Sequence, residues 1–386
     1  MKALNDTTLQ VTLTQPNAAF TAMLAHPSLV PIDKVLVERY ADKWTRPEHI
    51  VTSGPYKLSQ WVVNERLVAE RNAKYWDNAH TVINKVTYLP ISSEAADVNR
   101  YKAGEIDIVY TVPINQFAQL QKTMGDQLDV SPQLATYYYE FNTTRPPFND
   151  ARVRRALNMA LDKDIIAGKV LGQGQRPARL IGQPDIGGVT LHNPDYASWP
   201  REKRIAEAKN CWRRRGMMKA IRWSLPCSIT PLSRTSVSPL PPALCGRKPR
   251  RRGEATEPEW KTMLDTMHTH NFDAVRYAWI ADYDDAATFL NTFRTGDSEN
   301  TSQYSNPAYD EALRNAAKAS DVATRGKYYQ QAEDLLAQDV PAIPVYHYVR
   351  THLVKPWVGA SRRISWGITT PKTCTLKHPS ASGDGR

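Results

Sequence analysis

Three aspartates stand close together after a predicted strand, and they are the first candidates for chemistry in this 386-residue chain. Asp282, Asp284 and Asp285 could form a group of carboxylates that donates and accepts protons. A run of acids after a strand is more often a turn, because aspartate bonds to its own backbone there. No Ser-His or Cys-His order stands out, and the chain has no glycine-rich phosphate loop and no zincin motif. The sequence therefore predicts a protein that is not an enzyme.

Histidines are the second candidates for chemistry. His268 and His270 are two residues apart, a spacing that can place two imidazoles on one face of a strand, as in some zinc sites. No cysteine lies nearby, and no third ligand stands at a motif spacing. His347 and His352 are interpreted as incidental. We therefore predict neither a metal site nor a cofactor.

The elements that would position these residues alternate between strands and helices. An aromatic strand is predicted at 133–142 and a second strand at 272–280. The clearest helix is 150–163, which Asn149 or Asp150 can cap and whose apolar residues recur with helical spacing. Other predicted elements are strands at 7–13, 85–91, 105–110 and 342–349, a hairpin at 54–71, and helices at 18–25, 114–123, 307–319 and 324–338. This alternation indicates an α/β fold with mixed sheets.

Charge and cysteine are unevenly distributed. The net charge of +11 by itself is typical of a nucleic-acid or membrane-surface partner. However, residues 211–253 hold eleven Lys or Arg and no acid, and residues 361–386 add a net charge of +4. All four cysteines lie in the same two segments. The rest of the chain is therefore mildly acidic and free of cysteine, and it needs neither a disulfide framework nor a thiol metal site.

The segment 211–253 breaks the alternation of strands and helices. It contains six prolines and no sustained helical or strand period. One interpretation is a disordered basic linker. The interpretation that we favour is translation of GC-rich coding DNA out of frame, because the composition contradicts its neighbours at every level. We interpret the tail 361–386 in the same way.

Four motifs outside these segments carry a resemblance. The first runs from Gly54-Pro55-Tyr56 to Tyr75-Trp76, the second is Gly104-Glu105-Ile106-Asp107, the third runs from Asn142 to Ala156-Leu157, and the fourth from Tyr328-Tyr329 to Val345-Tyr346. In this order they resemble the family 5 solute-binding proteins, which include the oligopeptide, dipeptide and murein-peptide receptors. The resemblance covers residues 1–210 and 254–360.

The resemblance implies a fold and a division into lobes. The expected fold is α/β, of the periplasmic-binding-protein type II, with two lobes of mixed β-sheets joined by a hinge. Residues 1–130 would form part of the main lobe and 131–345 the second lobe, with 346–360 returning to the main lobe. The fold would be incomplete, since a signal peptide, the first strands of the main lobe and a small domain precede the position of Met1 in the family. The family's last strand is replaced after Gly359.

The family's ligand chemistry carries over to five residues of this chain. The resemblance implies that Asp282 pairs with the ligand's α-amino group and that Arg276 binds a carboxylate, which guanidinium can hold with two hydrogen bonds. Trp260, Trp279 and Tyr138 are expected to contact the ligand. The alternatives are a loop-capping aspartate, a surface arginine and plain core packing. We expect Asp282 and Arg276 to face a cleft near Trp279 and Tyr138.

The function implied is capture of short peptides and their delivery to an ABC permease. The expected partners are a short peptide and inner-membrane permease subunits, with no nucleic acid, and the protein is expected to be a monomer. Residues 262–268 and 275–283 resemble the murein-tripeptide branch. Ala135 and Ile280 replace a disulfide of the oligopeptide receptor, which fits that branch.

Three alternatives stay open on the sequence. One is a nucleic-acid-binding protein that uses the basic tract 211–253, and another is a peptide hydrolase. The third is a non-functional product of a pseudogene. The family is periplasmic, but the chain as written starts without a signal peptide, so it would stay in the cytoplasm. We expect that the chain as written does not fold stably.

Overall fold

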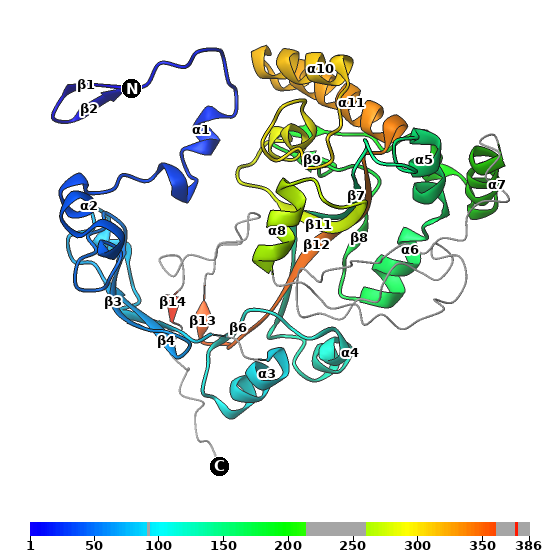
Figure 1. Ribbon diagram of the computed structural model, residues 1–386. Coiled ribbons are helices and arrows are strands. Elements are labelled where there is room, and N and C mark those ends of the chain that lie inside the picture. Colours follow the sequence, from blue (N-terminus) through cyan, green and yellow to red (C-terminus); the bar gives the residue numbers. More distant parts are fainter. Residues whose placement is uncertain (91–92, 214–259, 360–374, 377–386) are drawn as a thin grey trace. The chain divides into compact units, whose positions relative to one another are not determined.

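The computed structural model describes residues 1–90, 93–213, 260–359 and 375–376 (Figure 1). The chain divides into two compact units. Unit 1 contains Met1–His26 and Leu134–Tyr348, and unit 2 contains Pro27–Gln133 and Val349–Arg386. Two long strands, β7 (Leu128–Phe141) and β12 (Ala342–Val354), have residues in both units. All five candidate ligand-binding residues belong to unit 1.

The central sheet of unit 1 has the strand order β11-β7-β12, with β8 (Arg176–Pro177) pairing with β12. Strand β11 (Ala274–Ile280) runs antiparallel to β7, and their register places Ile280 opposite Ala135. Tyrosine, valine and threonine favour these strands because their side chains pack well on a pleated surface. The predicted strands at 133–142 and 272–280 are confirmed, and both β7 and β12 are longer than predicted.

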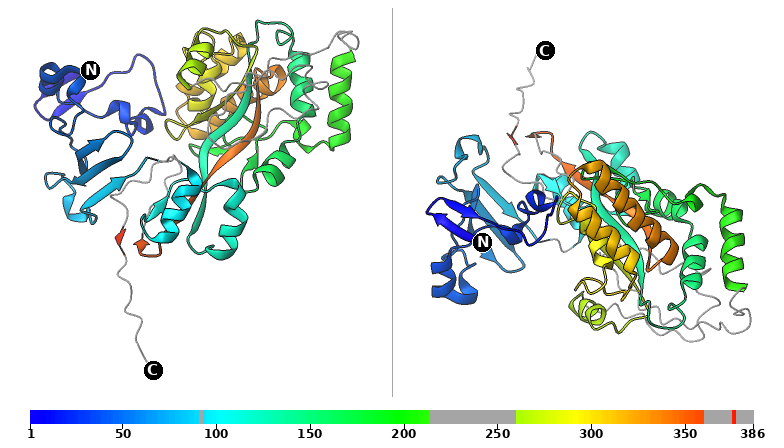
Figure 2. Two further views of the ribbon diagram at one scale, coloured as in Figure 1. Left: turned by 60° about the horizontal axis from the view of Figure 1, so that its bottom comes forward. Right: turned by 90° about the horizontal axis from the view of Figure 1, so that it is seen from above.

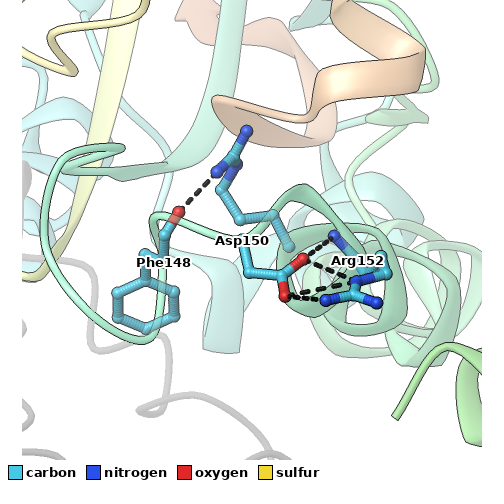
Figure 3. A network of polar contacts seen from close by, with 4 residues as sticks. Phe148, Asp150 and Arg152 are labelled. Atoms are coloured by element: carbon cyan, nitrogen blue, oxygen red, sulfur yellow. Dashed lines mark hydrogen bonds and ion pairs between the residues drawn. The ribbon is translucent and has the colours of Figure 1, made fainter. Parts of the chain in front are cut away.

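Helix α5 (Ala151–Ala160) begins where the sequence predicts it. The Asp150 carboxylate accepts a hydrogen bond of 2.9 Å from the Arg152 main-chain N–H and also pairs with the Arg152 guanidinium (Figure 3). Side-chain N-caps also begin two further helices. Asn306 caps α10 (Pro307–Lys318), and Asp321 caps α11 (Val322–Asp339). Helices α10 and α11 pack side by side (Figures 1 and 2).

Shorter elements complete the described part of unit 1. They are β1 (Lys2–Asn5), β2 (Thr8–Gln10), α1 (Phe20–Met23), α6 (Lys163–Ile165), a π-helical turn at Ile166–Leu171, β9 (Asp185–Ile186), β10 (Val189–Thr190), α7 (Arg201–Arg213), α8 (Trp260–His268) and α9 (Ala287–Leu290). Helix α7 continues to Arg213, so the break predicted at 211 is wrong by at least three residues. The remainder of the segment 211–253 lies outside the described residues.

Unit 2 contains a three-stranded antiparallel sheet of β3 (Tyr56–Val62), β4 (Arg66–Arg71) and β5 (Lys85–Tyr88). The predicted hairpin is confirmed, and Asn64 supplies its turn with a φ of 60°, which asparagine tolerates well. The other described elements of unit 2 are α2 (Lys34–Tyr40), α3 (Glu94–Ala103), β6 (Ile108–Val109), α4 (Ile114–Thr123), β13 (Val358–Gly359) and β14 (Thr375–Leu376). Only β14 falls within the tail 361–386, whose other residues lie outside the described ranges.

Buried apolar side chains hold unit 2 together. Val98 and Tyr101 of α3 pack with Phe117 and Leu120 of α4 and with Leu353 of β12. The last residues of β12 also pair with β6. No helix within the described ranges is long and apolar enough to cross a membrane.

Candidate functional site

The loop that follows β11 presents the carboxylate of Asp282. This side chain is 44% exposed, and its Oδ1 atom lies 3.8 Å from Nε2 of His26. Its Oδ2 atom accepts a hydrogen bond of 3.3 Å from the Thr288 hydroxyl. A carboxylate that is fixed on one oxygen and accessible to solvent can bind a cation. Both the ammonium-binding hypothesis and the loop-capping alternative for Asp282 are compatible with these contacts.

The two neighbouring aspartates have different surroundings. Asp284 is exposed and accepts the Gly187 main-chain N–H at 2.9 Å. Asp285 is buried, accepts the Tyr329 hydroxyl at 2.5 Å and pairs with Arg325 at 3.3 Å. These contacts anchor the loop to distant parts of unit 1. The three acids therefore have separate hydrogen-bond partners.

Thr288, in α9, links two of the candidate residues. Its Oγ1 accepts the indole N–H of Trp279 at 3.3 Å and the main-chain N–H of Asp282 at 3.0 Å. Thr288 was missed in the sequence because a single threonine in a four-residue helix gives no pattern. Only the folding of the loop back onto the end of β11 reveals it.

The register of β11 against β7 sorts the candidates onto two faces. Tyr277 lies opposite Tyr138, and Trp279 opposite Thr136, whereas Arg276 lies opposite Tyr139. Successive side chains of a strand point to opposite faces, so Arg276 projects away from Trp279 and Tyr138. The structure therefore does not bring Arg276 together with these two residues. Positions 276 and 279 are three residues apart, and an odd spacing in a strand already predicts opposite faces from the sequence.

An aromatic cluster forms on the Trp279 face. Tyr277, which sequence reasoning missed, contacts Tyr138 edge-on with ring centres 6.0 Å apart. Trp260 stacks on Tyr277 with ring centres 6.4 Å apart and is 45% exposed. Tyr138 is only 1% exposed, so core packing describes it better than ligand contact. Burial, with a smaller effect of Glu299, raises the pKa of Tyr277 to about 12, so its hydroxyl stays protonated at neutral pH.

Arg276 lies among tyrosines on the opposite face. It is 4% exposed, so the surface-arginine alternative is wrong. Tyr137 stacks on Tyr346 with ring centres 4.8 Å apart, and Tyr348 packs against both rings. Burial raises the pKa of Tyr137, and the neighbouring Arg276 opposes that rise. Arg276 therefore lies in a mostly aromatic environment.

The histidines do not share a strand face. His268 ends helix α8, and His270 follows it with a φ of 54° and contacts the Thr301 carbonyl at 3.0 Å. The strand geometry considered for a zinc pair is therefore wrong. Across the described ranges, no group of three or more His, Cys, Asp or Glu side chains is placed to hold a metal ion. Burial lowers the pKa of His347 to about 3, with smaller effects of Arg176 and Lys163.

The described residues form a mixed α/β fold. In a comparison with known families, residues 1–227 match the model of the bacterial extracellular solute-binding proteins, family 5. The chain belongs to this family.

Relatives and solved structures extend the match beyond residue 227. The chain is 46% identical over 365 residues to the periplasmic oligopeptide-binding protein OppA of Salmonella typhimurium, which covers 93% of this chain. It is 36% identical over 363 residues to the periplasmic murein peptide-binding protein MppA of Escherichia coli, which covers 92%. The crystal structure of Haemophilus influenzae OppA in complex with the peptide RPPGFSPFR matches with a TM-score of 0.78 at 31% identity, covering 94% of this chain and 72% of that one.

The relatives are longer than this chain. It spans 66% of the length of both curated relatives named above. The lower identity to the murein peptide-binding protein does not favour the murein-tripeptide branch that residues 262–268 and 275–283 resemble. The family is therefore assigned, and the ligand is a matter for a proposal.

Proposed function

We propose that this protein captures short peptides for an ABC importer and recognises their unblocked amino terminus through Asp282. The observation that carries the proposal is the half-exposed Asp282 carboxylate, fixed on one oxygen by Thr288 at the end of β11. A peptide ammonium pairs with a carboxylate through charge-assisted hydrogen bonds, which are stronger than neutral ones. The relatives named for oligopeptide binding support the same ligand class.

The aromatic residues near Asp282 have separate roles in this proposal. Trp279 and Trp260 supply apolar surface for the first residues of the peptide, and Tyr138 supports them from within the core. Arg276, on the other face of β11, is proposed to bind the peptide's carboxylate, which requires that its buried side chain becomes accessible to the ligand.

The ligand range and the partners belong to the same proposal. General oligopeptides are favoured over murein tripeptide, since identity to the oligopeptide-binding relative is ten percentage points higher. The partners are membrane-bound permease subunits, the compartment is the periplasm and the protein acts as a monomer. We also propose that the chain divides into two lobes, with boundaries at about residues 130 and 346.

Replacing Asp282 by asparagine tests the site. We expect the affinity for tri-alanine at pH 7 to fall about 30-fold, or about 2 kcal/mol, because the ligand ammonium loses its counter-charge. N-acetylated tri-alanine carries no ammonium, so its affinity should be the same for both proteins. Isothermal titration calorimetry measures all four values.

Asp284→Asn is the matched control, because it removes the same charge from an exposed residue of the same loop. It should leave the affinity for tri-alanine within about twofold of the original value. Equal binding of tri-alanine by the Asp282→Asn variant and the original chain would refute the ammonium role. Tighter binding of murein tripeptide than of tri-alanine would reverse the proposed ligand preference.

A further inference from the structure

We propose that Thr288 is the positioning residue of the ammonium site and that its hydroxyl sets the preference for peptides with an unblocked amino terminus. The proposal rests on the proposed function of Asp282. It assigns to Thr288 no contact with the ligand, because the side chain is buried behind Asp282 and Trp279.

The Thr288 hydroxyl uses its whole hydrogen-bonding capacity. A hydroxyl has one proton to donate and two lone pairs to accept with. The two lone pairs receive the N–H groups of Trp279, at 3.3 Å, and Asp282, at 3.0 Å. The single proton is therefore left for the remaining partner, Oδ2 of Asp282, at 3.3 Å. One atom thus fixes the main chain and the carboxylate of Asp282 and the indole of Trp279.

The helix that carries Thr288 is itself well anchored. Thr288 is 4% exposed, and Phe289 and Leu290 beside it are fully buried. Asp285 accepts the main-chain N–H of Ala287 at 2.9 Å and is held in turn by Arg325 and Tyr329. Buried side chains and hydrogen bonds from α11 therefore fix the position of the Thr288 hydroxyl. Through its hydrogen bonds, the hydroxyl in turn fixes the position of Asp282.

The two carboxylate oxygens of Asp282 have different surroundings. Oδ2 is bonded to Thr288, and Oδ1 lies toward His26 at 3.8 Å, a distance too long for a hydrogen bond. A ligand ammonium would therefore bind Oδ1 in a direction that Thr288 determines. Without the hydroxyl the carboxylate could rotate about its side chain, and part of the binding energy would be spent on ordering it again.

The test compares two substitutions of Thr288. Valine has the same shape without the hydroxyl, and serine keeps the hydroxyl without the methyl group. With the whole chain, we expect Thr288→Val to weaken the binding of tri-alanine about tenfold and leave the binding of N-acetylated tri-alanine unchanged. Thr288→Ser should restore the affinity for tri-alanine to within about threefold of the original value. If packing of the Thr288 methyl group mattered instead, Thr288→Ser would weaken binding more than Thr288→Val. The two variants therefore distinguish positioning by the hydroxyl from packing of the methyl group.

A double-mutant cycle separates this inference from the proposed function. If Thr288 acts through Asp282, Thr288→Val should have no further effect in a chain that carries Asp282→Asn. A full effect of Asp282→Asn with none of Thr288→Val would overturn the role of Thr288 alone. No effect of Asp282→Asn would overturn the proposed function itself.

A binding-independent measurement keeps the inference testable if peptide affinity is too weak to measure. The indole N–H of Trp279 gives an NMR signal that Trp279→Phe assigns. Thr288→Val should shift this signal toward the position of a solvent-exposed indole, and Thr288→Ser should not. Should valine prevent folding, Thr288→Ala, which adds no bulk, takes its place in both measurements. An unmoved signal in a folded variant without the hydroxyl would refute the positioning role.

Discussion

Replacing Arg154 by methionine is expected to lower the free energy of unfolding by about 3–5 kcal/mol. Arg154 lies in α5 and is 5% exposed. Its Nε donates to the carbonyls of Asp339 and Val340, both at 2.9 Å, and Nη1 donates to the Phe148 carbonyl. These bonds tie the start of α5 to the end of α11. Methionine fills much of the same volume but leaves these three carbonyls, two of them in buried contacts, without this donor.

Arg152→Met is the matched control for this experiment. It removes an arginine from the same helix turn, but the Arg152 side chain is 45% exposed and pairs with Asp150 (Figure 3). Surface pairs of this kind contribute about 0–1 kcal/mol. Urea unfolding followed by circular dichroism measures both variants. Equal losses for the two variants would contradict the structural role assigned to Arg154.

Glu140 is expected to make the protein more stable at pH 5 than at pH 8, by about 3–4 kcal/mol. Glu140 is 3% exposed in β7, and the Thr301 hydroxyl donates a hydrogen bond to it. Burial raises its pKa to about 8, the Thr301 bond opposes the rise and Glu299 adds to it. The folded state therefore keeps this proton between about pH 4.5 and 8, while the unfolded chain releases it. Stability then falls with rising pH, by about 1.4 kcal/mol per pH unit across this window.

Glu140→Gln removes the titrating group and keeps its shape. We expect the variant to be more stable than the original chain at pH 8 and to lose most of the pH dependence. Glu333 should leave a slope of the same sign, since burial raises its pKa to about 7. His347 contributes a slope of the opposite sign below about pH 6.5, because burial lowers its pKa to about 3 and only the unfolded chain takes up its proton there. Glu311→Gln, on an exposed face of α10, is the control and should not alter the slope. Thermal unfolding at pH 5 and 8 is the measurement, and identical slopes for Glu140→Gln and the original chain would contradict the prediction.

The segments best predicted from sequence are those whose signals are local. Helix α5 starts at Asp150 because a short acid accepts free main-chain N–H groups at a helix start. The hairpin of β3 and β4 turns at Asn64 because asparagine tolerates a positive φ. Helix α4 has the predicted bounds of residues 114–123. Helix α2 was missed, although Asp33 caps it, because only seven residues follow before it ends.

The candidate site was predicted in part. Trp279 and Asp282 both donate hydrogen bonds to Thr288 at the end of β11, and their contact with a ligand stays a prediction. The expectation that Arg276 lies beside Trp279 and Tyr138 was wrong because the two-residue period of a strand places it on the other face. Tyr138 is buried in the core, a property that its aromatic type alone does not decide.

The sequence by itself determined the family, the main strands and helices and the aspartate after β11, because each of these depends on neighbouring residues. The tertiary structure alone decided which groups meet across long stretches of chain. Glu140 meets Thr301, Arg154 meets Asp339, and Thr288 closes the loop onto Asp282. Such contacts depend on how strands pair and helices pack, and no local spacing encodes them. Burial makes these contacts matter for stability, because a polar group away from water has only its few protein partners to bond with.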